Sequence, residues 1–163
     1  MANFKVVDAN QLPALIAEQT KQLALQSHQL LMLVGLKDVE IILLDGLLRV
    51  AVSSRLSEEL LPLSNKRRAN EVEELFNNLI ANQTAGPLLL DRIQVLFEPS
   101  LQLDVLRCLK TASKYRPLIV NWPGDFDGKV LTFSRPGKPD YFNCSEAELN
   151  SVPVLRMAGH GEQ

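Results

Sequence analysis

At 163 residues, the chain has the length of one compact domain. Its 17 Lys and Arg residues and 19 Asp and Glu residues give a formal net charge of −2, which argues against a nucleic-acid binder that works through bulk positive charge. A hydrophobic fraction of 46% and a charged fraction of 22% are typical of a globular domain and exclude disorder for the body of the chain.

The first part of the chain predicts a helix followed by a buried strand. Apolar residues recur at helical spacing over Ala9–Gln26, and Pro13 falls in the first turn, where its missing N–H costs no hydrogen bond. The apolar run Leu30–Val34 is continuous and is closed by Gly35. Such a run is typical of a strand that is buried on both faces, as in a covered parallel sheet.

Two structures are open for residues 38–54. One is a short helix over Asp38–Arg49 followed by a strand over Val50–Ser53. The other is a hairpin about Asp45-Gly46, which is a recognised two-residue turn signal. The β-branched residues of this segment favour the hairpin and its leucines favour the helix, so local propensity does not decide between them.

The next part alternates helices with buried strands. A long helix is predicted over Asn65–Asn82, and shorter ones over Ser57–Leu61 and Leu101–Lys114. The apolar runs Leu88–Leu90 and Leu118–Val120 predict two more buried strands, adjacent and parallel to the first. This alternation predicts a three-layer α/β domain with a mainly parallel sheet.

The end of the chain changes character. Short strands over Lys129–Phe133 and Asp140–Asn143 are flanked by turn residues and predict a C-terminal edge hairpin. A short helical turn is expected after Ser145, and a frayed end over Met157–Gln163.

The cysteines and the apolar runs bear on the compartment. Cys108 and Cys144 are too few for a disulfide scaffold or a cysteine zinc site. Residues 1–8 lack the apolar run of a signal peptide, and no stretch of about 18 uncharged apolar residues follows. We therefore expect a cytoplasmic protein with no membrane partner.

The buried strand Leu88–Leu90 is followed by a carboxylate, Asp91. A Walker B element requires this arrangement, because it holds Mg²⁺ beside a nucleotide phosphate at the carboxyl edge of a sheet. An active hydrolase would often place a second acid next, but this chain has Arg92. Asp91 is the candidate Mg²⁺ ligand, and the alternative is that it only begins a loop.

A P-loop should follow the first strand, but its motif is incomplete. The sequence after Leu30–Val34 begins with Gly35 and lacks the second glycine, the Gly-Lys pair and the Ser or Thr. Lys37 comes too early to replace the missing lysine. The candidate nucleotide site is thus Gly35, Lys37, Asp91 and Asn121, where Asn121 either senses a phosphate or bonds to loop backbone.

Two charged runs form a candidate interaction patch. Lys66, Arg67 and Arg68 begin the long predicted helix, whereas Asp125 and Asp127 lie in a glycine-bounded loop. The alternatives are a solvated helix start and a tight turn. The basic run also supports a third hypothesis, a DNA-contacting subunit.

Two blocks of sequence resemble one protein family. Residues 88–101, LLLDRIQVLFEPSL, resemble the Walker B block of BrxF, the small P-loop protein of type 3 BREX phage-defence systems. The resemblance continues in residues 121–128, NWPGDFDG, and covers about residues 29–143. The chain departs from the family in lacking the rest of the Walker A loop after Gly35.

The resemblance implies a P-loop NTPase-like fold of the AAA or STAND kind. It divides the chain into an N-terminal helix (1–28), a degenerate P-loop NTPase-like domain (29–143) and a C-terminal tail (144–163). It also implies a role in anti-phage defence, with other BREX proteins as partners. A homo-oligomer is a further expectation, with Lys66–Arg68 of one copy against Asp125–Asp127 of its neighbour.

Two functions from different classes follow. The first is a non-hydrolysing assembly or regulatory module with no cofactor, because the phosphate cradle is lost. The second is a small ATPase that binds Mg·ATP through Asp91 and an atypical loop at Gly35.

Overall fold

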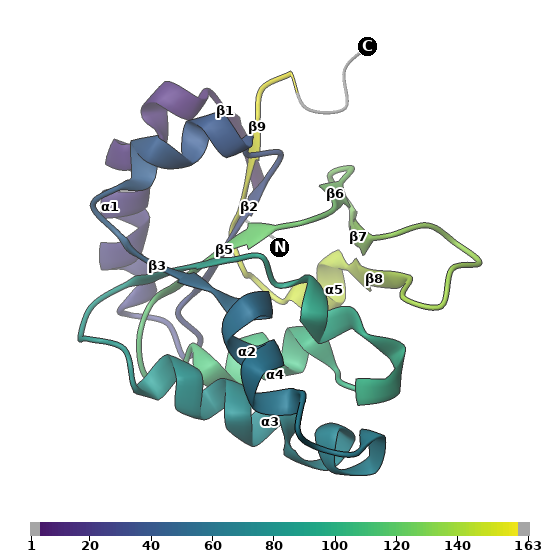
Figure 1. The fold of residues 1–163 in the computed structure, drawn as a ribbon. Coiled ribbons are helices and arrows are strands. Elements are labelled where there is room, and N and C mark those ends of the chain that lie inside the picture. The colour runs from purple at the N-terminus through teal and green to yellow at the C-terminus, as the bar shows by residue number, and fades with distance from the viewer. Residues whose placement is uncertain (1–3, 160–163) are drawn as a thin grey trace.

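The computed structural model describes residues 4–159, and a six-stranded parallel sheet lies at its centre (Figure 1). The strand order is β1-β9-β2-β5-β4-β3. The strands are β1 Phe4–Val7, β2 Leu30–Val34, β3 Leu48–Ala51, β4 Leu88–Asp91, β5 Leu118–Trp122 and β9 Val154–Met157.

The three strands predicted from continuous apolar runs are adjacent, parallel and buried. β5 lies between β2 and β4, and Leu118 is in register with both Leu30 and Leu88. Every residue of β2 and β4 is buried, and in β5 only Asn121 is partly exposed. Strands covered on both faces need apolar residues at consecutive positions, which explains the runs in the sequence.

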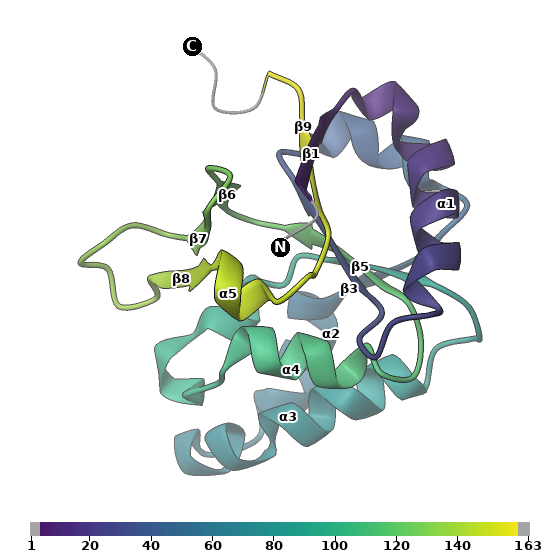
Figure 2. The ribbon, with the colours of Figure 1, turned by 180° about the vertical axis from the view of Figure 1, so that it is seen from behind.

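Helices cover both faces of the sheet, so the expected three layers are confirmed (Figure 1 and Figure 2). Leu31, Leu33 and Leu89 pack with α1 (Leu12–Leu23) and the 3₁₀ helix η2 (Asp38–Leu44). The alternate residues of the same strands pack with α2, α3 and α4 on the other face. The bounds of those helices are Val52–Leu60, Asn65–Ala81 and Val105–Ala112. No helix within residues 4–159 is both long and apolar enough to cross a membrane.

Shorter helical segments connect these elements. They are η1 Ala9–Gln11, η3 Gln94–Phe97, η4 Pro99–Leu101 and α5 Glu146–Leu149. The helix predicted over Leu101–Lys114 begins only at Val105, because the side chain of Asp104 caps it by accepting the Arg107 N–H at 3.1 Å. The helical turn predicted over Ser57–Leu61 is part of the longer α2.

Residues 38–51 form a helix and then a strand, so the hairpin hypothesis is wrong. β3 pairs in parallel with β4, with Leu48 opposite Leu88, and the turn at Gly46 does not join two paired strands. The helix is of the 3₁₀ type and ends at Leu44, earlier than predicted, with Ile41 and Leu44 buried against the sheet. The strand is also earlier than the predicted 50–53: β3 begins at Leu48 and ends at Ala51, because α2 begins at Val52. Tertiary pairing with β4 decides what local propensity left open.

The predicted edge hairpin belongs to a separate sheet. Strands β6 (Asp125–Phe126), β7 (Val130–Phe133) and β8 (Phe142–Ser145) are antiparallel, in the order β6-β7-β8. The hairpin is confirmed, but its place at the edge of the main sheet is wrong. Both edges of that sheet are occupied by β1 and β3, and β7 instead pairs with β6.

The two ends of the described chain meet in the main sheet. β9 lies between β1 and β2, with Val154 opposite Phe4 and Met32. The sequence analysis predicted neither β1 nor β9 and placed Met157 in a frayed end, but Met157 is buried in β9. Because β9 pairs with β2, the side of β2 that faces away from β5 is not left as an exposed edge. The rest of the predicted frayed end, 160–163, lies outside the described residues.

The chain passes from the main sheet to the small sheet at Gly124, where there is no room for a side chain. A Cβ at this position would collide with the carbonyl of Thr132. The same carbonyl accepts the indole N–H of Trp122 at 2.9 Å, so the collision would break a partly buried hydrogen bond between the two sheets.

We expect Gly124→Ala to lower the free energy of unfolding by about 2–3 kcal/mol. Gly46→Ala is the matched control, because a Cβ there meets no atom within 4 Å; it should change stability by less than about 1 kcal/mol. Urea denaturation measures both. Equal effects of the two substitutions would contradict the close approach at Gly124.

Candidate functional site

Three polar side chains lie in a row across the carboxyl end of the main sheet. Asp91 ends β4, and Asn121 lies near the end of the neighbouring β5. Leu89 and Ile119, two residues earlier in the same strands, pack toward α1 and η2. Side chains two residues apart in a strand lie on the same face, so Asp91 and Asn121 also face α1 and η2. Arg49 of β3 is in register with Leu89 and completes the row.

Both oxygens of the Asp91 carboxylate are bonded within the protein. Oδ2 accepts hydrogen bonds from Arg49 through Nε, at 2.8 Å, and through Nη2. Oδ1 accepts a hydrogen bond from Nδ2 of Asn121 at 2.8 Å. The carboxylate is thus held on one side by a cation and on the other by an amide, a strong charge-assisted arrangement.

The burial of Asp91 makes these partners necessary. Asp91 is 2% exposed, whereas the Arg49 side chain is 45% exposed. A buried carboxylate is costly unless it is paired and hydrogen-bonded. The more exposed Arg92 makes two longer contacts, at 3.9 Å to Oδ2 of Asp91 and at 4.0 Å to the exposed Asp38. A metal ion at Asp91 would therefore have to displace the Arg49 guanidinium.

The loop after β2 is also satisfied internally. Gly35 has φ 83°, a left-handed conformation that glycine adopts at no steric cost, and it turns the chain out of β2. The N–H of Lys37 donates to Oε1 of Glu40 at 2.9 Å, and the Lys37 carbonyl accepts the Glu40 N–H at 2.9 Å. A carboxylate of the chain itself thus occupies an N–H that a phosphate cradle would offer to a ligand.

A small cavity connects the loop with the polar row. Its volume is about 220 Å³, and its lining includes Gly35, Asp91 and Asn121. The structure therefore brings together three of the four predicted nucleotide-site residues; Lys37 does not line the cavity. Among residues 4–159 no group of three or more His, Cys, Asp or Glu side chains could hold a metal ion.

Comparisons with family models, with curated proteins and with solved structures find no match to this chain.

Sequence reasoning missed Arg49 as a member of the site. Its signal was an arginine inside a short run of otherwise apolar residues, Leu47 to Val52, that could have been a strand. The sequence analysis divided this run between a helix and a strand, so it did not predict on which face of a strand the arginine side chain lies. Only the pairing of β3 with β4 places it beside Asp91.

The predicted interaction patch is largely engaged within the chain. Arg67 forms an ion pair with Glu71 at 2.9 Å, and Arg68 donates to the carbonyls of Leu60 and Leu61 at the end of α2. The Lys66 side chain makes no hydrogen bond or ion pair with the described residues.

The acidic half of the patch forms the turn before β7. The Asp127 carboxylate accepts the N–H groups of Lys129 and Val130 at 2.8 Å each, and these hydrogen bonds lower the pKa of Asp127. Asp127 therefore stabilises a tight turn, which was the alternative to an interaction role. Asp125 lies in β6, two residues before it.

We expect Arg49→Met to lower the free energy of unfolding by about 2–3 kcal/mol, because it removes the hydrogen-bonded cation of the buried Asp91 carboxylate and leaves only the longer contact with Arg92 at 3.9 Å. Adding Asp91→Asn should recover part of this loss, since the amide carries no charge. Chemical denaturation measures the free energy of unfolding of the parent chain, of Arg49→Met and of the double variant.

The matched control is Arg55→Met, which removes an exposed arginine of α2 that has no ion pair and should change stability by about 0.5 kcal/mol at most. An Arg49→Met effect no larger than this would show that Asp91 does not depend on Arg49.

Proposed function

We propose that this chain is a non-hydrolysing, P-loop-like module that binds protein partners within a BREX-type phage-defence system. The observation that carries the proposal is the Arg49–Asp91–Asn121 row, in which a guanidinium occupies the cation position of the Walker B-like carboxylate. A module of this kind keeps the architecture of a nucleotide site while its own side chains satisfy the groups that a nucleotide would use.

The arrangement of the strands supports the P-loop-like part of the proposal. The loop at Gly35, the carboxylate of Asp91 and the amide of Asn121 come from the carboxyl ends of β2, β4 and β5. In open α/β sheets, ligands bind at this edge. Since β5 lies between β2 and β4, Asn121 is placed between the loop and the carboxylate, as a phosphate-sensing residue would be.

Internal pairing supports the absence of hydrolysis. Phosphoryl transfer depends on a metal ion that neutralises the developing charge and on N–H and Lys groups that hold the phosphates. Here Arg49 occupies the position that a metal ion would take at Asp91, and the Lys37 N–H donates to Glu40 instead of to a phosphate. The carboxylates of Asp38 and Glu40 would also repel a phosphate at this loop.

Partner binding is supported by an exposed apolar surface beside the polar row. Val39 and Ile42 of η2 are 80% and 73% exposed, and their spacing of three places them on one face of a 3₁₀ helix. Ile42 also lines an adjoining groove of about 580 Å³. The rest of its lining is both apolar and charged: Ile41, Leu44, Leu47 and Leu89, with Asp38, Asp45, Arg49 and Arg92. We call Val39, Ile42 and this groove the η2 surface. Contiguous exposed apolar groups commonly mark protein interaction sites.

The defence setting rests on the resemblance to BrxF. The two resembling blocks, residues 88–101 and 121–128, contain Asp91 and Asn121, which the structure joins by a hydrogen bond. The resemblance therefore includes residues that form the candidate site. Self-association through Lys66 and the acidic loop stays a prediction, to be measured by sedimentation at low and high salt.

A small Mg·ATP-dependent ATPase is the second candidate, favoured by the cavity that joins Gly35, Asp91 and Asn121. For the non-hydrolysing module, we expect the thermal midpoint with millimolar ATP to be the same with and without Mg²⁺, and no phosphate release. In Asp91→Asn, too, the thermal midpoint with ATP should be the same with and without Mg²⁺. A Mg²⁺-dependent rise of the midpoint that Asp91→Asn abolishes would favour the ATPase instead.

The η2 surface predicts a loss of assembly when it is charged. We expect Ile42→Glu to weaken partner binding by at least about tenfold and to reduce phage protection, because an apolar contact would be replaced by a desolvated charge. Leu61→Glu is the matched control, since Leu61 is 76% exposed at the end of α2, and it should change neither.

Pull-down with the other proteins of the native operon and plaque assays measure the two effects. Both variants change exposed positions, so the thermal midpoints should stay close to that of the parent chain. Equal protection by both variants would remove the η2 surface from the proposal.

A further inference from the structure

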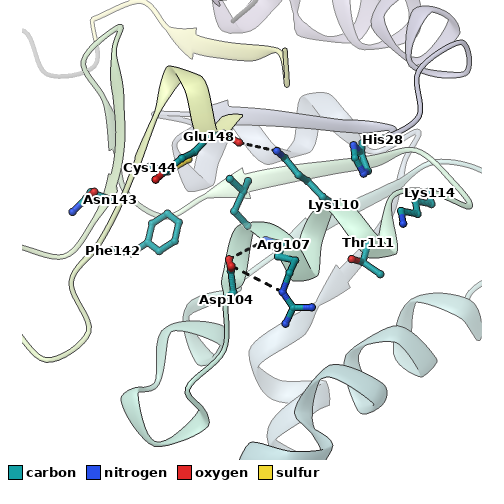
Figure 3. Close-up of a pocket in the computed structure, with 11 residues that line it drawn as sticks. His28, Asp104, Arg107, Lys110, Thr111, Lys114, Phe142, Asn143, Cys144 and Glu148 are labelled. Carbon is teal, nitrogen blue, oxygen red and sulfur yellow. Dashed lines mark hydrogen bonds and ion pairs between the residues drawn. The ribbon is translucent and has the colours of Figure 1, made fainter. Parts of the chain in front are cut away.

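A second cavity lies away from the carboxyl edge of the sheet, between α4 and the β8–α5 segment (Figure 3). Its volume is about 630 Å³, which is within the range of small-molecule sites. His28, just before β2, and Lys114, after α4, lie at one end of the group of labelled residues, and Phe142 and Asn143 of β8 lie at the other (Figure 3).

One end of this cavity is cationic without a counter-charge. Neither the Lys114 ammonium nor the His28 imidazole makes a hydrogen bond or ion pair with the described residues. Lys110 donates from Nζ to the backbone carbonyl of Glu148 at 2.7 Å, so its charge is not paired with a carboxylate. By contrast, Arg107 is paired with Glu73 at 3.2 Å.

The charges around the cavity also affect the pKa of His28. Burial lowers the pKa of His28, and the charges of Lys110 and Lys114 lower it further. The two carboxylates that line the cavity keep their charge, but neither forms an ion pair with His28, Lys110 or Lys114. Asp104 accepts the Arg107 N–H at the start of α4, and Glu148 accepts the Ser145 N–H at 3.1 Å. The field at His28 is therefore repulsive for a proton and attractive for an anion.

The other end of the cavity is aromatic and uncharged. The ring of Phe142 is half-buried and lies against Phe97 and Trp122, with centroid distances of 5.5 and 5.6 Å, which fix its orientation. Asn143 supplies an exposed amide beside it. Burial raises the pKa of Cys144 to about 12, so this thiol is a neutral part of the wall and not a nucleophile.

We propose that this cavity is a binding site for a small phosphorylated compound, whose phosphate lies among His28, Lys110 and Lys114 and whose flat or apolar part lies beside Phe142. The site is separate from the Arg49–Asp91–Asn121 row and does not depend on the function proposed above. The lysines act as point charges on the phosphate, and the imidazole donates a hydrogen bond to it. A bound phosphate also provides the missing counter-charge.

Titration with adenosine 5′-monophosphate, inorganic phosphate and adenosine tests the proposal, with NMR of the His28 imidazole as the readout. The monophosphate is expected to bind more tightly than phosphate, and adenosine not detectably at millimolar concentration. Both bound anions should raise the pKa of His28, because they reverse the repulsion by the lysines. His28→Asn assigns the signal, since the chain has only two histidines.

Lys114→Gln should weaken binding of the monophosphate about tenfold, because one charge-assisted contact is lost. Lys5→Gln removes the same charge from β1, outside the cavity lining, and should have no effect. The proposal is overturned by no binding of either anion, by equal effects of the two variants, or by binding of long oligonucleotides alone. Equal affinity for phosphate and monophosphate would keep the anion site and overturn the part given to Phe142.

Discussion

A carboxylate buried at the carboxyl edge of the sheet imposes the main constraint on this protein. Asp91 is 2% exposed, and a charge in that environment must have partners for each of its oxygens. Arg49 and Asn121 provide them, from the strands on either side of β4. The constraint therefore links three strands by side chains as well as by backbone, and it sets the chemistry that the edge of the sheet can perform.

The pairing at Asp91 separates the architecture of this site from its chemistry. A loop, a carboxylate and a polar strand-terminal residue converge where α/β sheets bind ligands. The same groups are already bonded to one another or to Arg49 and Glu40. Internal pairing lowers the affinity for any ligand that must break it, because the displaced arginine or glutamate loses its partner. Such a site is suited to holding a fixed shape, as a binding module requires.

The small antiparallel sheet gives the domain a second wall and a second cavity. Tight packing at Gly124 and the hydrogen bond from Trp122 to Thr132 attach this sheet to the end of β5. The aromatic cluster of Phe97, Trp122 and Phe142 fills the space between the two sheets. As a result β8 stands opposite α4, and the basic residues of α4 face a concave space rather than an open surface.

Much of the fold could be predicted because its central strands are buried on both faces. Continuous apolar runs identify β2, β4 and β5 from local sequence, and the apolar stripe of α3 has the period of a helix that covers a sheet. The polar residues that end these strands were also predictable as site candidates, since the carboxyl ends of parallel strands meet at one edge. Asp91 and Asn121 were found in this way.

Other features depend on contacts between distant segments, and local patterns do not encode them. β1 and β9 are short strands from the two ends of the described chain, and each is stabilised by pairing in the sheet rather than by its own propensity. The choice between a hairpin and a helix–strand unit at residues 38–51 was decided by the free edge of β4. That same pairing brings Arg49 to Asp91. The sequence alone therefore determined which strands are buried and which carboxylate ends one of them, whereas the tertiary structure decided that this carboxylate binds an arginine, because the two residues meet only when strands 42 positions apart in sequence pair.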